Sequence, residues 1–257
     1  MLESISFLKP ANSNHSVKEA VITLFLTQPI VNPEKFRELL KEFKPEFQSF
    51  DETFSLKYQF NQDGIHKESL NNDGFVFTRF NNENGGRSKI LRGVNEEYRQ
   101  FLAFHNLSYN RWKDFFEEFT QCIKLISNFD KSLYVLAFSI HYVDEFYWEG
   151  NSPMPLKEIL KSNQDFIPNK IFESTESTSV LITNSESHIT ERLEVKVRLN
   201  NLNISHNVIY NVGENISIEN FVADSKYLSE IEKLHIFNKK ILQELLTKPI
   251  CKLINLI

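Results

Sequence analysis

Glycine is scarce in this sequence, with 7 residues in 257, so a fold built on glycine-rich loops is not expected. The two cysteines, Cys122 and Cys251, are too few for a disulfide framework or a four-cysteine metal site, and they fit a reducing compartment. No run approaches the roughly 18 apolar residues that a membrane helix needs. Residues 1–15 lack the charged start and the apolar core of a secretory signal. We therefore predict a cytoplasmic protein that does not contact a membrane.

Positive charge is also in deficit. Lys and Arg total 29 against 34 Asp and Glu, which gives a net charge of -5. A protein that holds nucleic acid by bulk electrostatics is usually basic, so this balance argues against nucleic acid as the main partner. A local basic patch remains compatible with it.

The known short motifs of catalysis are missing. The sequence has no phosphate-binding glycine loop, no dinucleotide-binding glycine fingerprint and no nucleophile elbow. Its 7 histidines are scattered, and none has a second ligand at helical spacing that would suggest a metal site. We therefore predict no catalytic residues, no metal and no cofactor, and we favour a non-catalytic protein over an enzyme.

Phenylalanine is abundant instead, with 23 residues that lie mostly at positions expected for a core. The stretch 131–148 is the most informative one, because it is apolar on both faces when read with a period of two. Such a pattern predicts a central strand whose two faces are both covered. One predicted face contains Tyr134, Leu136, Phe138, Ile140 and Tyr142, and the other contains Leu133, Val135, Ala137, Ser139, His141 and Val143.

Regular patterns on either side of this stretch predict the other elements. Three predicted helices are the most distinct: 32–43, 109–127 with an aromatic stripe, and 226–246, which Pro249 follows. A short helix is expected at 155–160. Alternating patterns predict strands at 16–28, 53–62, 74–80, 87–94, 98–105, 179–183, 191–199 and 204–212.

The order of these elements predicts an α+β fold with antiparallel sheets and helices packed on one side. Each half of the chain follows a similar β-α-β-β-β-α order. We therefore expect an N-terminal α+β half at 1–130 and a C-terminal α+β half at 131–257, closely packed together. No repeat at the level of residues supports this division.

Several aromatic and basic positions give the chain a resemblance to a known family. They are Phe75 and Phe77, the basic strand from Lys89 to Arg92, Tyr109 with Trp112 at a helix start, and Tyr142 with Asp144 at a strand end. In this pattern the chain resembles a sporadically distributed family of uncharacterised bacterial proteins of about this length. It departs from the family at Asp144, where Asn is usual, and at His141, where Arg is expected. The resemblance implies a place in mobile or defence gene islands, such as a phage-defence operon.

Two sets of residues are candidates for contact with a ligand or partner. His141, Tyr142, Asp144 and Glu145 end the central stretch, but alternation places His141 and Asp144 on opposite faces, which favours a structural role over an acid–base pair. The second set is basic and lies among aromatic residues that could stack on single-stranded nucleic acid. We favour the alternative that it is a solvated sheet face with the aromatic residues buried beneath it, because acidic residues lie nearby in the sequence. The basic set comprises Arg79, Arg87, Lys89, Arg92, Arg99 and Arg111. From the two sets we select Arg87, Lys89, Arg92, His141, Tyr142 and Asp144 as contact residues.

Three functions remain open on this basis. The first is a non-catalytic interaction or sensing module with a protein partner or a second copy of itself. The second is a small-ligand-binding protein with an apolar pocket between sheet and helix. The third is a nucleic-acid-binding protein that uses the basic strands, which the charge balance disfavours. The apolar tail at 250–257 is expected to be ordered, either on its own domain or in a dimer interface.

Overall fold

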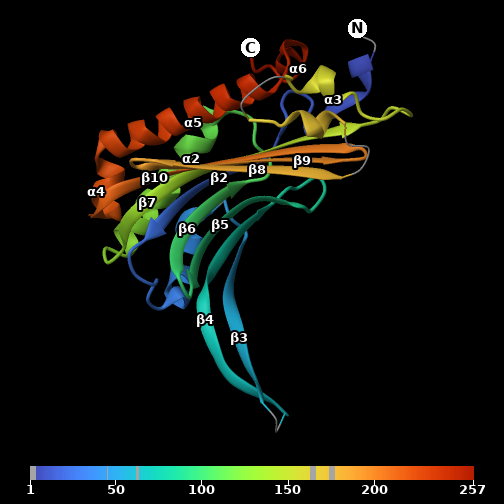
Figure 1. Cartoon of the computed structure of the whole chain (residues 1–257). Helices are drawn as coiled ribbons and strands as arrows, with labels where there is room; N and C mark the ends of the chain where they lie inside the picture. Colours follow the sequence, from blue (N-terminus) through green and yellow to red (C-terminus); the bar gives the residue numbers. More distant parts are fainter. Residues whose placement is uncertain (1–3, 45, 62–63, 163–165, 174–176) are drawn as a thin grey trace.

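The computed structural model describes the chain except for residues 1–3, 45, 62–63, 163–165 and 174–176, and it leaves the side chains of 56–61 and 65–71 undescribed. Helical and extended segments alternate along the described chain (Figure 1). The N-terminal half contains η1 Ser4–Phe7, β1 Leu8–Pro10, β2 Val17–Leu26, η2 Pro33–Leu39, α1 Leu40–Phe43, β3 Ser49–Asn61, β4 Gly64–Phe80, β5 Arg87–Glu96, β6 Arg99–Asn106 and α2 Trp112–Phe129. The C-terminal half contains β7 Tyr134–Trp148, α3 Leu156–Ile159, η3 Asn169–Phe172, β8 Thr178–Glu186, β9 Ile189–Arg198, β10 Asn201–Ser217, α4 Ile218–Ala223, α5 Ser225–Leu245 and α6 Lys248–Leu253.

The strands form one continuous ten-stranded sheet rather than several sheets. The order is β3-β4-β5-β6-β2-β7-β10-β9-β8, and β1 pairs with the far end of β7. All the described pairings are antiparallel. The predicted α+β class and the central place of the stretch 131–148 are therefore confirmed.

The helices of the described residues cover one side of this sheet, which bends so that its other side is concave (Figure 1). The helix α2 packs on the sheet through the stripe that its sequence predicts, with Phe115, Phe119 and Ile126 almost fully buried. Beneath the helices lie two apolar clusters. One joins α2 and α4 to the middle strands, and the other joins α3, α5 and α6 to β9 and β10. None of the helices among the described residues is long and apolar enough to cross a membrane.

The prediction for the central strand was wrong in two respects. Only one of its faces is covered by helices, so the other face is free to line a cavity. The predicted division into faces also fails at its start, where the pairing with β2 shifts between Phe25 and Leu26. Because of this bulge, Val135 is fully buried with Phe138, whereas Leu136 is 46% exposed.

The C-terminal tail, residues 250–257, is ordered and packs against α5 of its own chain, which is one of the two expected arrangements. Pro249 lies in the first turn of α6, where its missing N–H does no harm. Ile250 and Ile254 are buried in the same cluster as α5, and Gln243 donates a hydrogen bond to the carbonyl oxygen of Leu256 at 2.9 Å.

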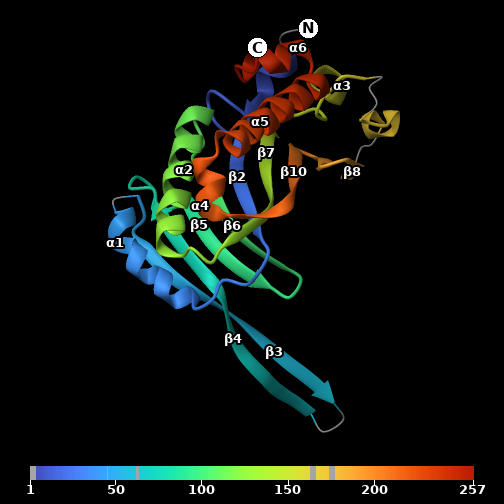
Figure 2. The same cartoon turned by 90° about the vertical axis from the view of Figure 1, so that its left-hand side faces the viewer.

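The two ends of the sheet differ in shape. At one end the β3–β4 hairpin extends well beyond the body of the molecule (Figures 1 and 2). At the other end β8 is the edge strand, next to β9. The bend between these ends is what turns the helix-free face into a hollow.

Candidate functional site

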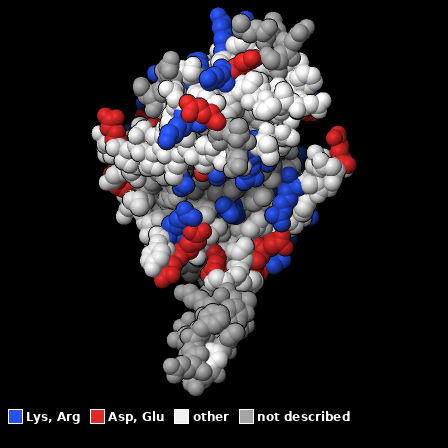
Figure 3. Space-filling view, turned by 45° about the vertical axis from the view of Figure 1, so that its right-hand side comes forward, with Lys and Arg blue, Asp and Glu red and all other residues white. Residues whose placement is uncertain are grey.

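A cavity of about 570 Å³ lies in the hollow of the helix-free face. Side chains from six strands line it, and Lys and Arg side chains gather in the middle of this face (Figure 3). An adjoining cavity of about 660 Å³ shares Val76 and Arg92 with it. The lining of the first cavity is Glu19, Val21, Thr23, Phe25, Val76, Arg87, Ile90, Arg92, Arg99, Phe101, Ala103, His105, Ser139, His141 and Asn207.

Cross-strand pairing brings the polar side chains together from distant parts of the sequence. His105 on β6 pairs with Val21 on β2, which pairs with His141 on β7, which pairs with Asn207 on β10. Paired residues on neighbouring strands point to the same face, so these side chains form one row across the floor of the cavity. Arg92 lies in the next row, opposite Ala103.

Arginine supplies the positive charge of the cavity. Three arginines, Arg87, Arg92 and Arg99, face a single glutamate, Glu19, in the lining. Arg99 pairs with Glu96 at 2.5 Å, whereas Arg87 and Arg92 have no ion pair with any described residue. Arg92 is half-buried, and burial lowers its pKa. An unpaired, partly desolvated guanidinium is unfavourable unless an anion neutralises it.

Three polar atoms in the lining lack a hydrogen-bond partner among the described residues. They are Nε of Arg92, Nε2 of His105 and Oδ1 of Asn207. His105 is anchored on its other nitrogen, since Nδ1 lies 2.7 Å from Oε1 of Glu19. The hydrogen bond from His105 lowers the pKa of Glu19, so this carboxylate stays ionised. Buried polar atoms normally have hydrogen-bond partners, so three such atoms without a partner in one cavity indicate a place for a polar ligand.

His141 also lines the cavity, but it is held differently. Its Nε2 lies 2.7 Å from Oγ of Ser205, and burial lowers its pKa. Val21 separates it from His105 in the cross-strand row. The two histidines therefore present separate polar groups to a ligand rather than one acid–base pair.

Apolar side chains form part of the floor beside the arginines. Val21, Phe101 and Ala103 are buried there, with Phe25 and Val94 packed against them. The guanidinium groups of Arg92 and Arg99 lie 5.4 and 5.6 Å from the centroid of the Phe101 ring. Such contacts hold the two arginines in place without neutralising them.

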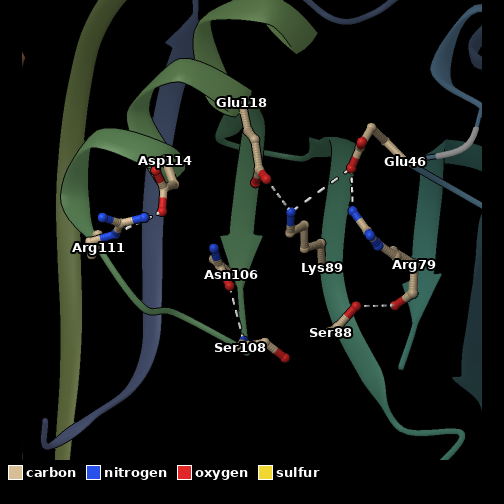
Figure 4. A network of polar contacts seen from close by, with 9 residues as sticks. All are labelled: Glu46, Arg79, Ser88, Lys89, Asn106, Ser108, Arg111, Asp114 and Glu118. Atoms are coloured by element: carbon tan, nitrogen blue, oxygen red, sulfur yellow. Dashed lines mark hydrogen bonds and ion pairs between the residues drawn. The ribbon is translucent and has the colours of Figure 1, made fainter. Parts of the chain in front are cut away.

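Lys89, which the sequence grouped with Arg87 and Arg92, lies on the other face of the sheet. It forms ion pairs with Glu118 of α2 and, at 3.9 Å, with Glu46, which also binds Arg79 (Figure 4). Arg111 pairs with Asp114 at the start of α2. The basic set is thus divided, and Lys89 joins β5 to α2 instead of facing a ligand.

Tyr142 and Asp144 also lie on the helix-covered side, as the alternation from His141 predicts. Both line a smaller cavity of about 280 Å³ beneath α2 and α5. Of the six selected residues, the structure therefore brings together Arg87, Arg92 and His141 on the concave face. Tyr142 and Asp144 both line the smaller cavity on the helix-covered side.

Sequence reasoning missed Glu19, His105, Ser139 and Asn207 as parts of the same lining. None of these four polar residues belongs to a recognisable motif, so each is a weak signal by itself. Their convergence depends on the strand order β5-β6-β2-β7-β10, which local periodicity does not reveal.

Comparisons with models of known protein families and with curated proteins found no match to this chain. The resemblance based on the aromatic and basic positions therefore stays a prediction.

Proposed function

We propose that this chain is a non-catalytic binding module that senses a small anionic ligand on the concave face of its sheet. The observation that carries the proposal is the convergence of Arg87 and Arg92, neither in an ion pair with a described residue, on a cavity in which the Nε–H donor of Arg92 has no hydrogen-bond partner among the described residues. Arginine suits phosphate and carboxylate groups because its planar fork can bind two oxygens at once. The volume of about 570 Å³ lies within the range of small-molecule sites.

A small anion fits better than a long nucleic acid. The chain as a whole has a net charge of -5, so a polyanion that extended beyond the hollow would be repelled. The adjoining cavity is lined by three carboxylates, those of Asp73, Glu96 and Glu97. They place negative charge beside the arginine cavity. A compact ligand in the hollow would avoid these three carboxylates and would meet the three arginines, with Glu19 as the one acidic side chain of the lining.

Binding without catalysis is favoured by how the two histidines are held. His105 is engaged by Glu19 and His141 by Ser205, and Val21 lies between them. A sensing role also requires a partner that receives the signal. The edge strands β3 and β8 each have one neighbouring strand among the described residues, so a protein partner or a second copy of the chain could extend the sheet at either edge. Sedimentation of the protein with and without ligand would reveal a second copy.

Two further expectations belong to this proposal. The first is that the two halves, 1–130 and 131–257, are related. In support of it, the first long strand of each half pairs with the last strand of that half, β2 with β6 and β7 with β10. The second is a role in a defence operon, which rests on the resemblance alone.

The test is isothermal titration of the protein with pyrophosphate, with nucleoside phosphates and with a single-stranded oligonucleotide. Binding of one of the small anions should weaken at least about tenfold in Arg92→Gln, because a charge-assisted hydrogen bond is lost. Arg111→Gln is the matched control, since this exposed arginine lies on the helix-covered side. If no small anion binds, or if both variants bind alike, the proposal is wrong. Tight binding of the oligonucleotide alone would favour the nucleic-acid alternative.

A further inference from the structure

A second cavity, of about 280 Å³, lies on the opposite side of the sheet from the arginine site. It is bordered by the segment before β2, the start of β2, the end of β7, the start of α2, the helix α5 and the C-terminal tail. The described side chains around it include a fully buried carboxylate, two tyrosines and two histidines. Its lining is His15, Val17, Tyr109, Asn110, Arg111, Trp112, Tyr142, Asp144, His235, Asn238, Lys239, Leu242, Ile254, Asn255 and Leu256.

The carboxylate is that of Asp144, which is only 2% exposed. Ser16 donates a hydrogen bond from Oγ to its Oδ1 at 2.6 Å. Asp144 forms no ion pair with any residue in the described part of the chain. A buried carboxylate without a cation is unfavourable, and this one borders a cavity that a cation could enter.

Two basic residues at the rim do not fill this role. Arg111 pairs with Asp114 at 3.2 Å and its side chain is 74% exposed. Lys239 is exposed on α5. Burial and the Ser16 hydrogen bond are the influences on the pKa of Asp144, and neither Arg111 nor Lys239 is among them.

The walls beside Asp144 are aromatic and uncharged. The rings of Tyr109 and Tyr142 meet almost at right angles, with centroids 5.7 Å apart. Oη of Tyr142 lies 2.9 Å from Nδ1 of His235, and burial lowers the pKa of His235 to about 4, so this imidazole is neutral near pH 7. Trp112 is stacked between His235 and Phe116, so it supports the wall rather than offering a free face.

We propose that this cavity binds a small organic ammonium ion, with its charge against Asp144 and its alkyl groups against the rings of Tyr109 and Tyr142. One carboxylate with aromatic walls suits a weakly hydrated ammonium ion, because the rings attract the cation and the alkyl groups are removed from water. A bare metal ion would instead require several oxygen ligands. The proposal does not depend on the anion site.

The test is isothermal titration of the full chain with choline and with its neutral isostere, 3,3-dimethylbutan-1-ol. Choline should bind with millimolar or better affinity, and the neutral alcohol should bind at least about tenfold more weakly, since the two differ mainly in charge. Asp144→Asn should lower the affinity for choline by a similar factor. This variant keeps an oxygen for the Ser16 hydrogen bond and removes a desolvated charge, so it is expected to fold.

Two further variants separate the cavity from the rest of the molecule. Tyr109→Leu should weaken choline binding while the affinity for the alcohol changes little, because the ring interacts with the charge. Arg92→Gln on the concave face should leave choline binding unchanged. The proposal is overturned if choline does not bind, if the alcohol binds as well as choline, or if Asp144→Asn retains the affinity of the wild type.

Discussion

At the scale of single residues, the core depends on a few large rings. The side chain of Phe138 on β7 is fully buried beneath α4, and its ring centroid lies 5.5 Å from that of Phe221. Phe138→Ala should lower the free energy of unfolding by about 3–5 kcal/mol, because a cavity replaces the ring. Tyr98→Ala is the matched control, since Tyr98 is 90% exposed and should change stability by less than about 0.5 kcal/mol. Urea denaturation measures both, and a loss below about 1 kcal/mol at Phe138 would contradict the assignment.

Two buried groups at the smaller cavity should oppose each other in their pH dependence. Burial raises the pKa of Asp144 to about 6, so between pH 4 and 6 the folded chain holds a proton that the unfolded chain has released. This contribution stabilises the fold at low pH and is lost as the pH rises through about 6. Burial lowers the pKa of His235 to about 4, so its contribution is present above pH 6.5 and is lost as the pH falls to about 4.

Asp144→Asn removes the first of these contributions and leaves the second. The stability of the variant should therefore rise more steeply with pH between 4 and 6 than that of the wild type, by a total of about 3 kcal/mol. His235→Asn should change the slope in the opposite direction. Denaturation curves at several pH values test this, and parallel profiles for the wild type and Asp144→Asn would show that the carboxyl group is not desolvated.

At the scale of elements, the tail helix α6 should stabilise the whole C-terminal half. Ile250 and Ile254 are 0% and 5% exposed, and each such side chain is worth about 1.5–3 kcal/mol when buried. Deleting residues 250–257 should therefore lower the melting temperature sharply or cause aggregation. Leu253→Ala is the control, because Leu253 is 40% exposed and should have little effect. A truncated protein with unchanged thermal stability would mean that the tail does not pack as described.

The elements also show which features the sequence could predict. The period of 3.6 identified the buried stripe of α2, because a helix displays its packing face directly in its sequence. The bulge before Phe138 could not be foreseen, since it arises from the pairing with β2. The sheet face on which Arg87 lies could not be predicted from the sequence either. Alternation alone places Arg87 with Lys89, but a shift in the β4–β5 pairing between Arg79 and Phe80 puts Arg87 on the face of Arg92.

At the scale of the whole molecule, a positive hollow lies within a negatively charged chain. At physiological salt, the electrostatic attraction of the hollow is screened over a distance of about 8 Å. The hollow can therefore attract a compact anion without holding a long polyanion. A single-stranded oligonucleotide should therefore bind no more tightly than weak micromolar at physiological salt, as measured by fluorescence anisotropy. A salt-sensitive, sub-micromolar complex that is lost in Arg92→Glu would make nucleic acid the better candidate.

The most direct test of the central claim follows the Nε–H signal of Arg92 by nitrogen-15 NMR during a titration with pyrophosphate. This atom has no hydrogen-bond partner among the described residues, so a bound anion should change its chemical environment more than that of other arginines. We predict a saturable shift of the Arg92 signal, absent in a titration with the same ionic strength of sodium chloride, while the Arg111 signal stays in place. If Arg111 shifts and Arg92 does not, the anion binds elsewhere and the account of the concave face is wrong.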